Sequence, residues 1–348
     1  MTLGPLMVDI AGAALSDEDR EVLSHPLIGG VILFTRNFAS IEQLTALTRD
    51  IRALRTPALL IAADHEGGRV QRFRKDFTVL PSMRLIGRRY AEQPQAAREL
   101  AKDCGWLMAA ELLAVGIDLS FAPVVDLDYG ASTVIGDRAF HRNPAIVADL
   151  AIAFMHGMRD AGMMATAKHF PGHGAVVADS HVALPVDRRA YADLSDDLIP
   201  YRRLIDNALP SIMMAHVVYE QVDALPASFS ARWIQQELRG RLGFSGAVFS
   251  DDLTMEGASV VGDMPARVRK ALAAGCDMTP ICNNRPAVLA TLTALGDVRD
   301  PVSQMRVARM RGHGQGTREA LIASTHWRRC QHSIAQCLAP PPLELKGG

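Results

Sequence analysis

Eight short apolar runs, separated by longer stretches with helical periodicity, constrain the fold of this chain more than any other feature. They cover residues 6–10, 30–34, 58–63, 117–122, 163–167, 211–215, 246–250 and 276–282. Continuous apolar runs suit strands of a parallel sheet that is covered on both faces, and strands alternating with helices are typical of βα units. Eight such units in 348 residues predict an α/β fold, a single-domain (β/α)8 TIM barrel.

One helix can be predicted in detail. From Pro94 onward, apolar residues recur at the i, i+3, i+4, i+7 spacing of an amphipathic helix. A proline is tolerated in a first helical turn, and Gly116 is a stop signal before the next strand. We predict that the barrel domain covers residues 1–335 and that residues 336–348, rich in proline and glycine, form a loosely held tail.

Composition excludes several classes of protein. A formal net charge of -1 argues against a nucleic-acid binder. The five cysteines include no CxxC pair, so neither a zinc knuckle nor a disulfide framework is indicated. We see no signal peptide in residues 1–12 and no apolar run near the ~20 residues of a membrane span. We therefore expect a cytoplasmic protein that has no membrane or nucleic-acid partner.

Polar side chains follow most of the predicted strands. They include Thr35, Arg36, Asn37, Asp64, Asp126, Asp128, Lys168, His169, His216, Asp251, Asp252, Asn283 and Asn284. Polar groups gathered at the carboxyl ends of barrel strands mark an active face.

The loop after the fifth run holds an acid/base candidate. It reads Lys168-His169-Phe170-Pro171-Gly172-His173-Gly174 and continues to Asp179-Ser180-His181. Asp179 stands close enough to orient the imidazole of His181, and such a dyad can donate and recover a proton near neutral pH.

The same loop could instead hold a metal ion, with His169, His173, Asp179 and His181 as ligands. Pro171 and Gly172 prevent a regular helix between the first two histidines, so the facing geometry of an i, i+4 pair is lost. We therefore expect no metal and no cofactor. His173 could equally form a hydrogen bond that stabilises the loop.

Two further motifs each allow a functional and a structural interpretation. After the third run, Asp64 and Arg72 flank Gly67-Gly68 and could clamp ligand hydroxyls, or form a tight turn with solvated charges. After the seventh run, Asp251 could attack an anomeric carbon. Alternatively, Asp251 or Asp252 is the N-cap of the next helix, with Glu256 in its first turn.

Arg138 also has two interpretations. It could bind a hydroxyl or carboxylate of a ligand, or form a salt bridge with Asp126 or Asp128.

Taken together, the motifs around Asp64–Arg72, Lys168–Gly174, Asp179–His181 and Ser250–Leu253 resemble glycoside hydrolase family 3. More narrowly, they resemble its single-domain bacterial β-N-acetylglucosaminidases, over residues of about 7–285. The resemblance implies removal of terminal N-acetylglucosamine from 1,6-anhydro-muropeptides during cytoplasmic peptidoglycan recycling, a process that bears on cell shape and division. The expected partner is this sugar substrate, with or without a peptide, and we expect a monomer.

The resemblance also implies residue roles. Asp251 corresponds to the nucleophile of a retaining mechanism, and His181 with Asp179 to the acid/base dyad. The positions that hold the sugar and its N-acetyl group are Asp64, Arg72, Arg138, Lys168 and His169, with His216 and Met255 near the same pocket.

Two positions depart from the family pattern. His65 stands where a glutamine is usual, and the eighth run carries Thr279-Pro280 where an aliphatic pair is usual. Because a proline removes a donor from a strand ladder, we expect the eighth strand to be short or distorted.

Alternatives remain open. Within the family, the chain could be a β-glucosidase, a β-xylosidase or an N-acetylglucosaminide phosphorylase. Outside it, a metal-dependent hydrolase or a non-catalytic sugar-binding regulator could use the same barrel.

Overall fold

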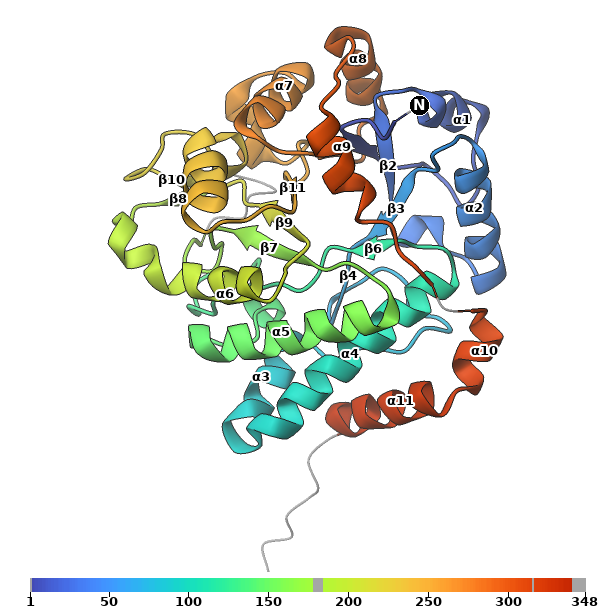
Figure 1. Cartoon of the computed structure of the whole chain (residues 1–348), viewed down its shortest axis with the longest axis vertical. Coiled ribbons are helices and arrows are strands. Elements are labelled where there is room, and N and C mark those ends of the chain that lie inside the picture. The colour runs from blue at the N-terminus through green and yellow to red at the C-terminus, as the bar shows by residue number, and fades with distance from the viewer. Residues whose placement is uncertain (1, 178–183, 315, 340–348) are drawn as a thin grey trace, which may run out of the picture.

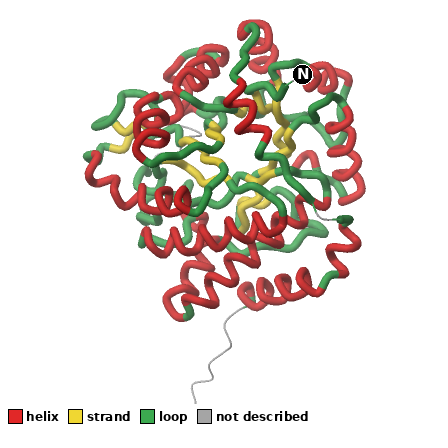
Figure 2. Tube along the Cα trace, viewed as in Figure 1, coloured by secondary structure: helices red, strands yellow, loops and turns green. Residues whose placement is uncertain are grey.

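The computed structural model describes residues 2–177, 184–314 and 316–339, and each predicted apolar run overlaps a buried parallel strand (Figure 1). These strands are β1 (Leu6–Val8), β2 (Ile28–Leu33), β3 (Leu60–Ala63), β6 (Leu119–Ser120), β7 (Thr166–Phe170), β9 (Ser211–Met214), β11 (Ala247–Phe249) and β12 (Thr279–Ile281). Figure 2 shows the strands in the interior with helices around them. The α/β class is confirmed, and each predicted run overlaps a strand. β7 extends to Phe170, however, so Lys168 and His169 lie within this strand and not, as the sequence predicted, after it.

The strand ladders form two parallel sheets. One has the order β12-β1-β2-β3-β6 and the other the order β11-β9-β7. Two isolated parallel bridges lie between them, Val124 with Lys168 and Phe249 with Met278. No closed barrel ladder is present among the described residues, so the (β/α)8 barrel remains a prediction at this point.

The eighth strand is short but regular. β12 pairs with β1 in an unbroken register, Met7 opposite Pro280. At three residues it is as long as β1 and β11, so the expected distortion is absent.

Two small sheets accompany the main strands. Strands β10 (Val218–Tyr219) and β8 (Val186–Asp187) are parallel, while β4 (His65–Gly67) and β5 (Val70–Gln71) form an antiparallel hairpin. In this hairpin Gly67 has φ +118°, and a Cβ there would lie 2.5 Å from the carbonyl oxygen of Pro81. A glycine is required at this position because of both the backbone conformation and the close approach.

The helices match the periodicity of the sequence. They are α1 (Asp17–Ser24), α2 (Ile41–Ala53), α3 (Met83–Glu92), α4 (Pro94–Ala114), α5 (Pro144–Ala161), α6 (Ser195–Asp206), α7 (Met264–Ala274), α8 (Arg285–Leu295), α9 (Pro301–Ala308), α10 (Arg318–Ala323) and α11 (Thr325–Leu338). Short 3-10 helices cover Thr35–Asn37, Gly136–Arg138, Tyr191–Leu194, Ala227–Phe229 and Glu256–Val261, and a π-helix covers Arg232–Arg241. The helix predicted from Pro94 is confirmed as α4, and Gly116 follows it with φ +86°.

Helices α4 and α5 pack side by side through glycines (Figure 1). A Cβ at Gly105 would lie 2.1 Å from the carbonyl oxygen of Phe154, and one at Gly157 would lie 2.1 Å from that of Lys102. Backbone therefore meets backbone at this contact, which leaves no room for even a methyl group.

Helix α11 packs against the outer side of α4 and ends at Leu338. The indole N–H of Trp327 donates to Oε1 of Glu111 on α4 at 2.9 Å, and Cys330 and Ile334 are buried. The division of the chain at residue 335 stays a prediction. None of the described helices has both the length and the apolar character needed to cross a membrane.

Substituting Gly105 tests the helix contact. An alanine normally stabilises a helix interior by up to about 1 kcal/mol, but Gly105→Ala should lower the free energy of unfolding by about 1–3 kcal/mol because α5 must move. Gly12→Ala is the control, since its Cβ would meet only one atom, at 3.9 Å. Urea unfolding measures both, and a Gly105→Ala variant as stable as the wild type would contradict the close contact.

Candidate active site

A pocket of about 490 Å³ opens where the carboxyl ends of the parallel strands meet. Polar and charged side chains form much of its wall, together with a few apolar ones. The lining residues are Ile32, Phe34, Asp64, Glu66, Arg69, Val70, Arg72, Phe121, Thr133, Val134, Arg138, Lys168, His169, His173, Met213, Asp251, Asp252, Met255, Pro280, Cys282 and Asn283. This volume suits a small polar ligand such as a sugar ring with its substituents.

The pocket brings together most of the residues that the sequence singled out. Asp64, Arg72, Arg138, Lys168, His169, Asp251 and Met255 all line it. His216 is buried beside it, and Asp179 and His181 lie outside the described residues. The roles expected for these residues stay predictions, while their positions are now known for all but the dyad.

A buried lysine joins two carboxylates on the wall of the pocket. Lys168 Nζ lies 2.9 Å from Oδ1 of Asp64 and 2.6 Å from Oε1 of Glu66, and its side chain is 3% exposed. Arg72 Nη2 donates to Oδ2 of Asp64 at 3.1 Å. Arg138 forms a two-pronged pair with Glu66, with both N–H···O distances 2.8 Å.

The mutual attraction within this cluster keeps every member ionised. Burial alone would raise the pKa of Asp64, yet Lys168 and Arg72 hold that pKa well below its usual range. Burial likewise opposes ionisation of Glu66, but Arg138 and Lys168 lower its pKa to about 2. The two carboxylates outweigh burial at Lys168 and raise its pKa. The pocket therefore presents fixed charges near neutral pH.

Asp126 anchors the loop that carries the histidines. Its Oδ2 lies 2.7 Å from Nδ1 of His169, and its Oδ1 accepts the backbone N–H of His173 at 2.7 Å. The guanidinium of Arg138 can only donate, and its Nη2 lies 3.5 Å from Nε2 of His169. This arrangement favours the tautomer in which Nδ1–H donates to Asp126 and Nε2 is an acceptor.

Asp251 lies two residues after the end of strand β11, and groups that stabilise a negative charge surround it. Burial would raise its pKa, but His169, His216, the backbone N–H of Asp252 and Lys168 together lower it. The Asp252 N–H donates to Oδ1 of Asp251 at 2.9 Å. An ionised carboxylate in a pocket can act as a nucleophile.

Neither aspartate is the N-cap of the next helix, so that structural interpretation is wrong. The N-cap of the 3-10 helix Glu256–Val261 is Met255. Asp252 instead closes the loop, because its carboxylate accepts the N–H of Thr254 at 3.0 Å and that of Cys282 at 3.1 Å. Burial raises the pKa of Asp252 to about 6, so the two adjacent carboxyls differ in their protonation behaviour.

His216 supports the aspartate loop from behind. Its Nε2 lies 3.0 Å from the carbonyl oxygen of Asp252, and its ring stacks on Phe229 at a centroid distance of 5.6 Å. Burial lowers its pKa. His216 therefore positions the loop, and it is not among the residues that line the pocket.

The salt-bridge partners expected for Arg138 are also wrong. Arg138 pairs with Glu66, while Asp128 pairs with Arg84 and Asp126 binds His169. Glu66 is the site residue that sequence reasoning missed. Asp126 was expected at the active face, but its contact with His169 was not predicted. Glu66 carried a usable signal, since it lies two residues after Asp64 and side chains alternate along an extended chain.

His65 does not take part in the pocket. Its ring packs against Phe73 and Phe77, with centroids 5.8 and 5.9 Å away. Burial and the nearby Arg74 and Arg72 lower its pKa to about 3, so the imidazole is neutral. A histidine therefore fits where the family pattern has a glutamine, because this side chain packs in the core and does not line the pocket.

Comparison with known proteins identifies the family. Residues 5–311 match the glycosyl hydrolase family 3 N-terminal domain. A β-hexosaminidase from Thioalkalivibrio sulfidiphilus is 56% identical over 345 residues, which is 99% of each chain. The crystal structure of NagZ from Neisseria gonorrhoeae in complex with N-trifluoroacetyl-D-glucosamine has a TM-score of 0.93 and 45% identity, covering 98% of this chain and 99% of that one. A family 3 β-N-acetylglucosaminidase from Paenibacillus has a TM-score of 0.84 and 30% identity, covering 96% of this chain and 67% of that one.

This chain belongs to glycoside hydrolase family 3. It is a glycosidase, and the activity that its relatives support is that of a β-hexosaminidase. The family resemblance seen in the sequence is confirmed.

The charge cluster makes stability depend on pH in a defined way. The pKa of Glu66 falls from 4.5 to about 2 on folding, so its stabilisation is complete above pH 4.5 and is lost as the pH falls toward 2. Glu66→Gln should lower the free energy of unfolding by about 3–5 kcal/mol at pH 7, since it leaves buried Arg138 without its carboxylate partner. The same variant should also make the free energy of unfolding less dependent on pH between pH 4.5 and about 2.

Urea unfolding as a function of pH measures both effects. Glu92→Gln is the control, because Glu92 is exposed at the end of α3 and should change stability by no more than about 0.5 kcal/mol. Equal stabilities of Glu66→Gln and the wild type at pH 7 would refute the stabilising role of the pair.

Proposed function

We propose that this glycosidase is a retaining exo-β-N-acetylglucosaminidase that removes terminal non-reducing N-acetylglucosamine from 1,6-anhydro-muropeptides. The observation that carries the proposal is the partly buried Asp251 carboxylate, whose pKa is lowered in a sugar-sized pocket beside the Lys168 cluster. The Neisseria gonorrhoeae NagZ is in complex with N-trifluoroacetyl-D-glucosamine, an N-acylated glucosamine, and this ligand supports the choice of sugar.

The architecture that we propose for this site is the (β/α)8 barrel. At one seam between the two sheets, the N–H of Thr166 donates to the carbonyl of Ala122 at 2.8 Å, and the N–H of Val125 donates to that of Lys168 at 2.8 Å. At the other seam, the N–H of Ser250 donates to the carbonyl of Met278 at 3.1 Å. These hydrogen bonds support a ring of strands in the order β1-β2-β3-β6-β7-β9-β11-β12.

The sugar is held by the groups of fixed charge. Asp64 can accept hydrogen bonds from sugar hydroxyls, while Arg72 and Lys168 can donate to the hydroxyl oxygens. Arg138 and the ring of His169 lie on the same wall, where an N-acetyl carbonyl can accept a hydrogen bond from the guanidinium. These five side chains are already held in place by contacts with one another, with Glu66 and with Asp126, so little reorganisation is needed when the ligand arrives.

The reaction takes place in two displacements. In the first, Asp251 forms an ester bond to the anomeric carbon as the glycosidic C–O bond breaks, and protonated His181 gives its proton to the leaving oxygen. In the second, neutral His181 takes a proton from water, the water oxygen attacks the anomeric carbon, and the ester to Asp251 breaks. Asp179 orients His181 and stabilises its charged form.

The chain that leads into the proposed dyad is firmly held. The hydroxyl of Tyr219 donates to the carbonyl of Gly172 at 2.6 Å, and a Cβ at Gly174 would lie 1.8 Å from the carbonyl oxygen of Leu127. The first half of the loop is therefore fixed against the sheet, four residues before residue 178. This anchoring supports an acid/base that reaches the pocket from the same loop.

The cellular role in the proposal is cytoplasmic peptidoglycan recycling by a monomer that needs no cofactor. Its support is the similarity to NagZ over the whole chain. Release of N-acetylglucosamine from a GlcNAc-anhydro-MurNAc disaccharide, with and without its peptide, tests the substrate directly. Turnover of simple aryl glycosides without turnover of this disaccharide would exclude the recycling role.

The nucleophile is tested with p-nitrophenyl N-acetyl-β-glucosaminide. Asp251→Ala should lose activity by a factor on the order of 10⁴ or more, because no covalent intermediate can form. The exposed Asp206→Ala is the control and should keep wild-type turnover. Near-normal turnover by Asp251→Ala would refute the assignment.

The acid/base role predicts that the loss of activity in a His181 variant depends on the leaving group. His181→Ala should lose roughly 10²–10⁴-fold in kcat/KM on substrates with poor leaving groups. On the nitrophenyl substrate the first step needs little acid, so the glycosyl-enzyme should accumulate and produce a burst. Mass spectrometry of the quenched variant measures the adduct, and its absence together with unchanged kinetics would show that His181 has no such role.

A further inference from the structure

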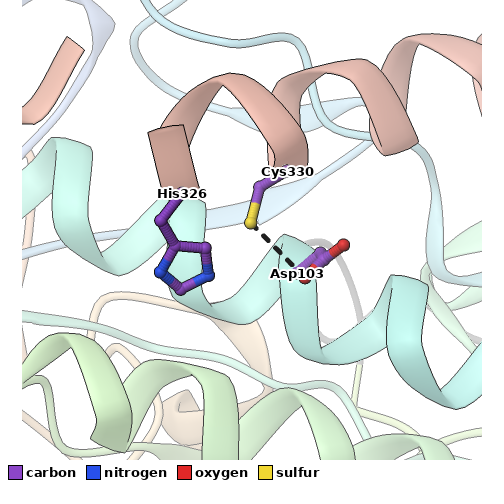
Figure 3. A group of neighbouring side chains, drawn as sticks. All are labelled: Asp103, His326 and Cys330. Atoms are coloured by element: carbon purple, nitrogen blue, oxygen red, sulfur yellow. Dashed lines mark hydrogen bonds between the residues drawn. The ribbon is translucent and has the colours of Figure 1, made fainter. Parts of the chain in front are cut away.

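A second cluster of chemically reactive side chains lies on the outside of the fold, between α4 and α11. Figure 3 shows Asp103 on α4 facing His326 and Cys330 on α11. One potential ligand atom from each of these residues lies within 4.8 Å of those of the other two. None of the three lines the catalytic pocket, so the glycosidase reaction does not account for the cluster.

The helices present the three groups in a fixed arrangement. His326 and Cys330 are four residues apart on α11, so their side chains lie on the same face, one turn from each other. Asp103 lies opposite them on α4, a helix of 21 residues. Ligands on regular helices need little ordering when an ion binds.

The one short distance within the cluster matches a tetrahedral site. Cys330 Sγ lies 3.4 Å from Oδ1 of Asp103. Two ligands of Zn²⁺ at the usual Zn–S and Zn–O lengths are separated by about 3.6 Å at a tetrahedral angle. Sulfur and oxygen therefore stand almost as they would around the ion, and only the imidazole has to move closer.

The imidazole of His326 is held in place by stacking, and its ring nitrogens are available to a metal ion. Its ring stacks on Trp106 of α4 at a centroid distance of 3.8 Å with an interplanar angle of 23°. Within the described part of the chain, the ring nitrogens of His326 make no hydrogen bond. His326 is exposed whereas Cys330 is buried, so the fourth position of the site faces solvent.

The positively charged side chains near the cluster compete only weakly with a metal ion for Asp103. Arg329 Nη2 lies 3.6 Å from Oδ1 of Asp103, and its side chain is 68% exposed. Such an exposed pair contributes little and is easily replaced by an ion. Lys102, the neighbour of Asp103, is paired with Asp160 at 2.8 Å.

We propose that Asp103, His326 and Cys330 bind a Zn²⁺ ion that fixes α11 against α4, with water as the fourth ligand. A site of one thiolate, one imidazole and one carboxylate suits a borderline-soft ion such as zinc. On binding, the Cys330 thiol loses its proton to solvent and sulfur bonds to the metal. The site is structural, and it is distinct from the catalytic pocket.

Titration of the full chain with Co²⁺, a spectroscopic substitute for zinc, is the test. The wild type should develop a thiolate-to-cobalt charge-transfer band and intense visible bands of a tetrahedral ion, and Zn²⁺ should displace both. Cys330→Ser should lose the charge-transfer band. His326→Ala should weaken binding at least tenfold.

Two control variants show whether the cobalt bands arise from the cluster between α4 and α11. His332→Ala removes another exposed histidine of α11, one whose Nε2 lies 2.9 Å from Nε2 of Gln336, and should bind as the wild type does. Cys282→Ser removes the thiol in the catalytic pocket and should keep the charge-transfer band. A band that disappears in Cys282→Ser but persists in Cys330→Ser would place the ion in the pocket and overturn the proposal.

Thermal unfolding gives an independent readout. Zn²⁺ should raise the unfolding temperature of the wild type and of His332→Ala, and at the same concentration it should raise that of His326→Ala by less. Because His326 is exposed, its alanine variant should fold and keep full glycosidase activity, which checks that the protein is intact. Absence of the cobalt bands in the wild type, or equal affinity in His326→Ala, would refute the site.

Discussion

The contact on which the site depends most is the buried ammonium group of Lys168 between Asp64 and Glu66. Each of these charges would be costly inside the protein alone, and together with Arg72 and Arg138 they form a network in which every charge has a partner. The network joins the β4–β5 hairpin, the segment around Arg138 and strand β7, which are far apart in the sequence. It therefore sets both the shape of the pocket and the charge that the pocket presents to a sugar.

The strands could be located from the sequence because buried parallel strands are continuous apolar runs. The rule that polar groups follow such strands found Asp64 and Asp251, whereas Lys168 and His169 reach the site from within β7. What could not be predicted depends on tertiary contacts. The partner of Arg138 is Glu66, and no local pattern distinguishes it from Asp126 or Asp128. The helix after Asp251 has Glu256 in its first turn, as expected, but neither aspartate is its N-cap, because Asp252 accepts N–H groups from Thr254 and from Cys282.

The two aspartates at the end of β11 illustrate how environment separates identical side chains. Asp251 is surrounded by donors and positive charge, and its pKa falls, whereas the pKa of Asp252 rises to about 6 because burial dominates. Asp252 uses its carboxylate to close the loop, which keeps Asp251 facing the pocket. The different contacts and pKa values of these two adjacent aspartates support our proposal that Asp251 is the nucleophile, while Asp252 holds the loop.

The pairing of β1 with β12 has a consequence for synthesis on the ribosome. Strand β1 has β2 on one side and β12 on the other, and these two partners are separated by most of the chain. Translation from the end of β1 at Val8 to the end of β12 at Ile281 takes roughly 15 to 55 s at ordinary rates of elongation. During that time one edge of an apolar strand has no partner, so the nascent chain carries an open edge that chaperones can cover until the last strand emerges.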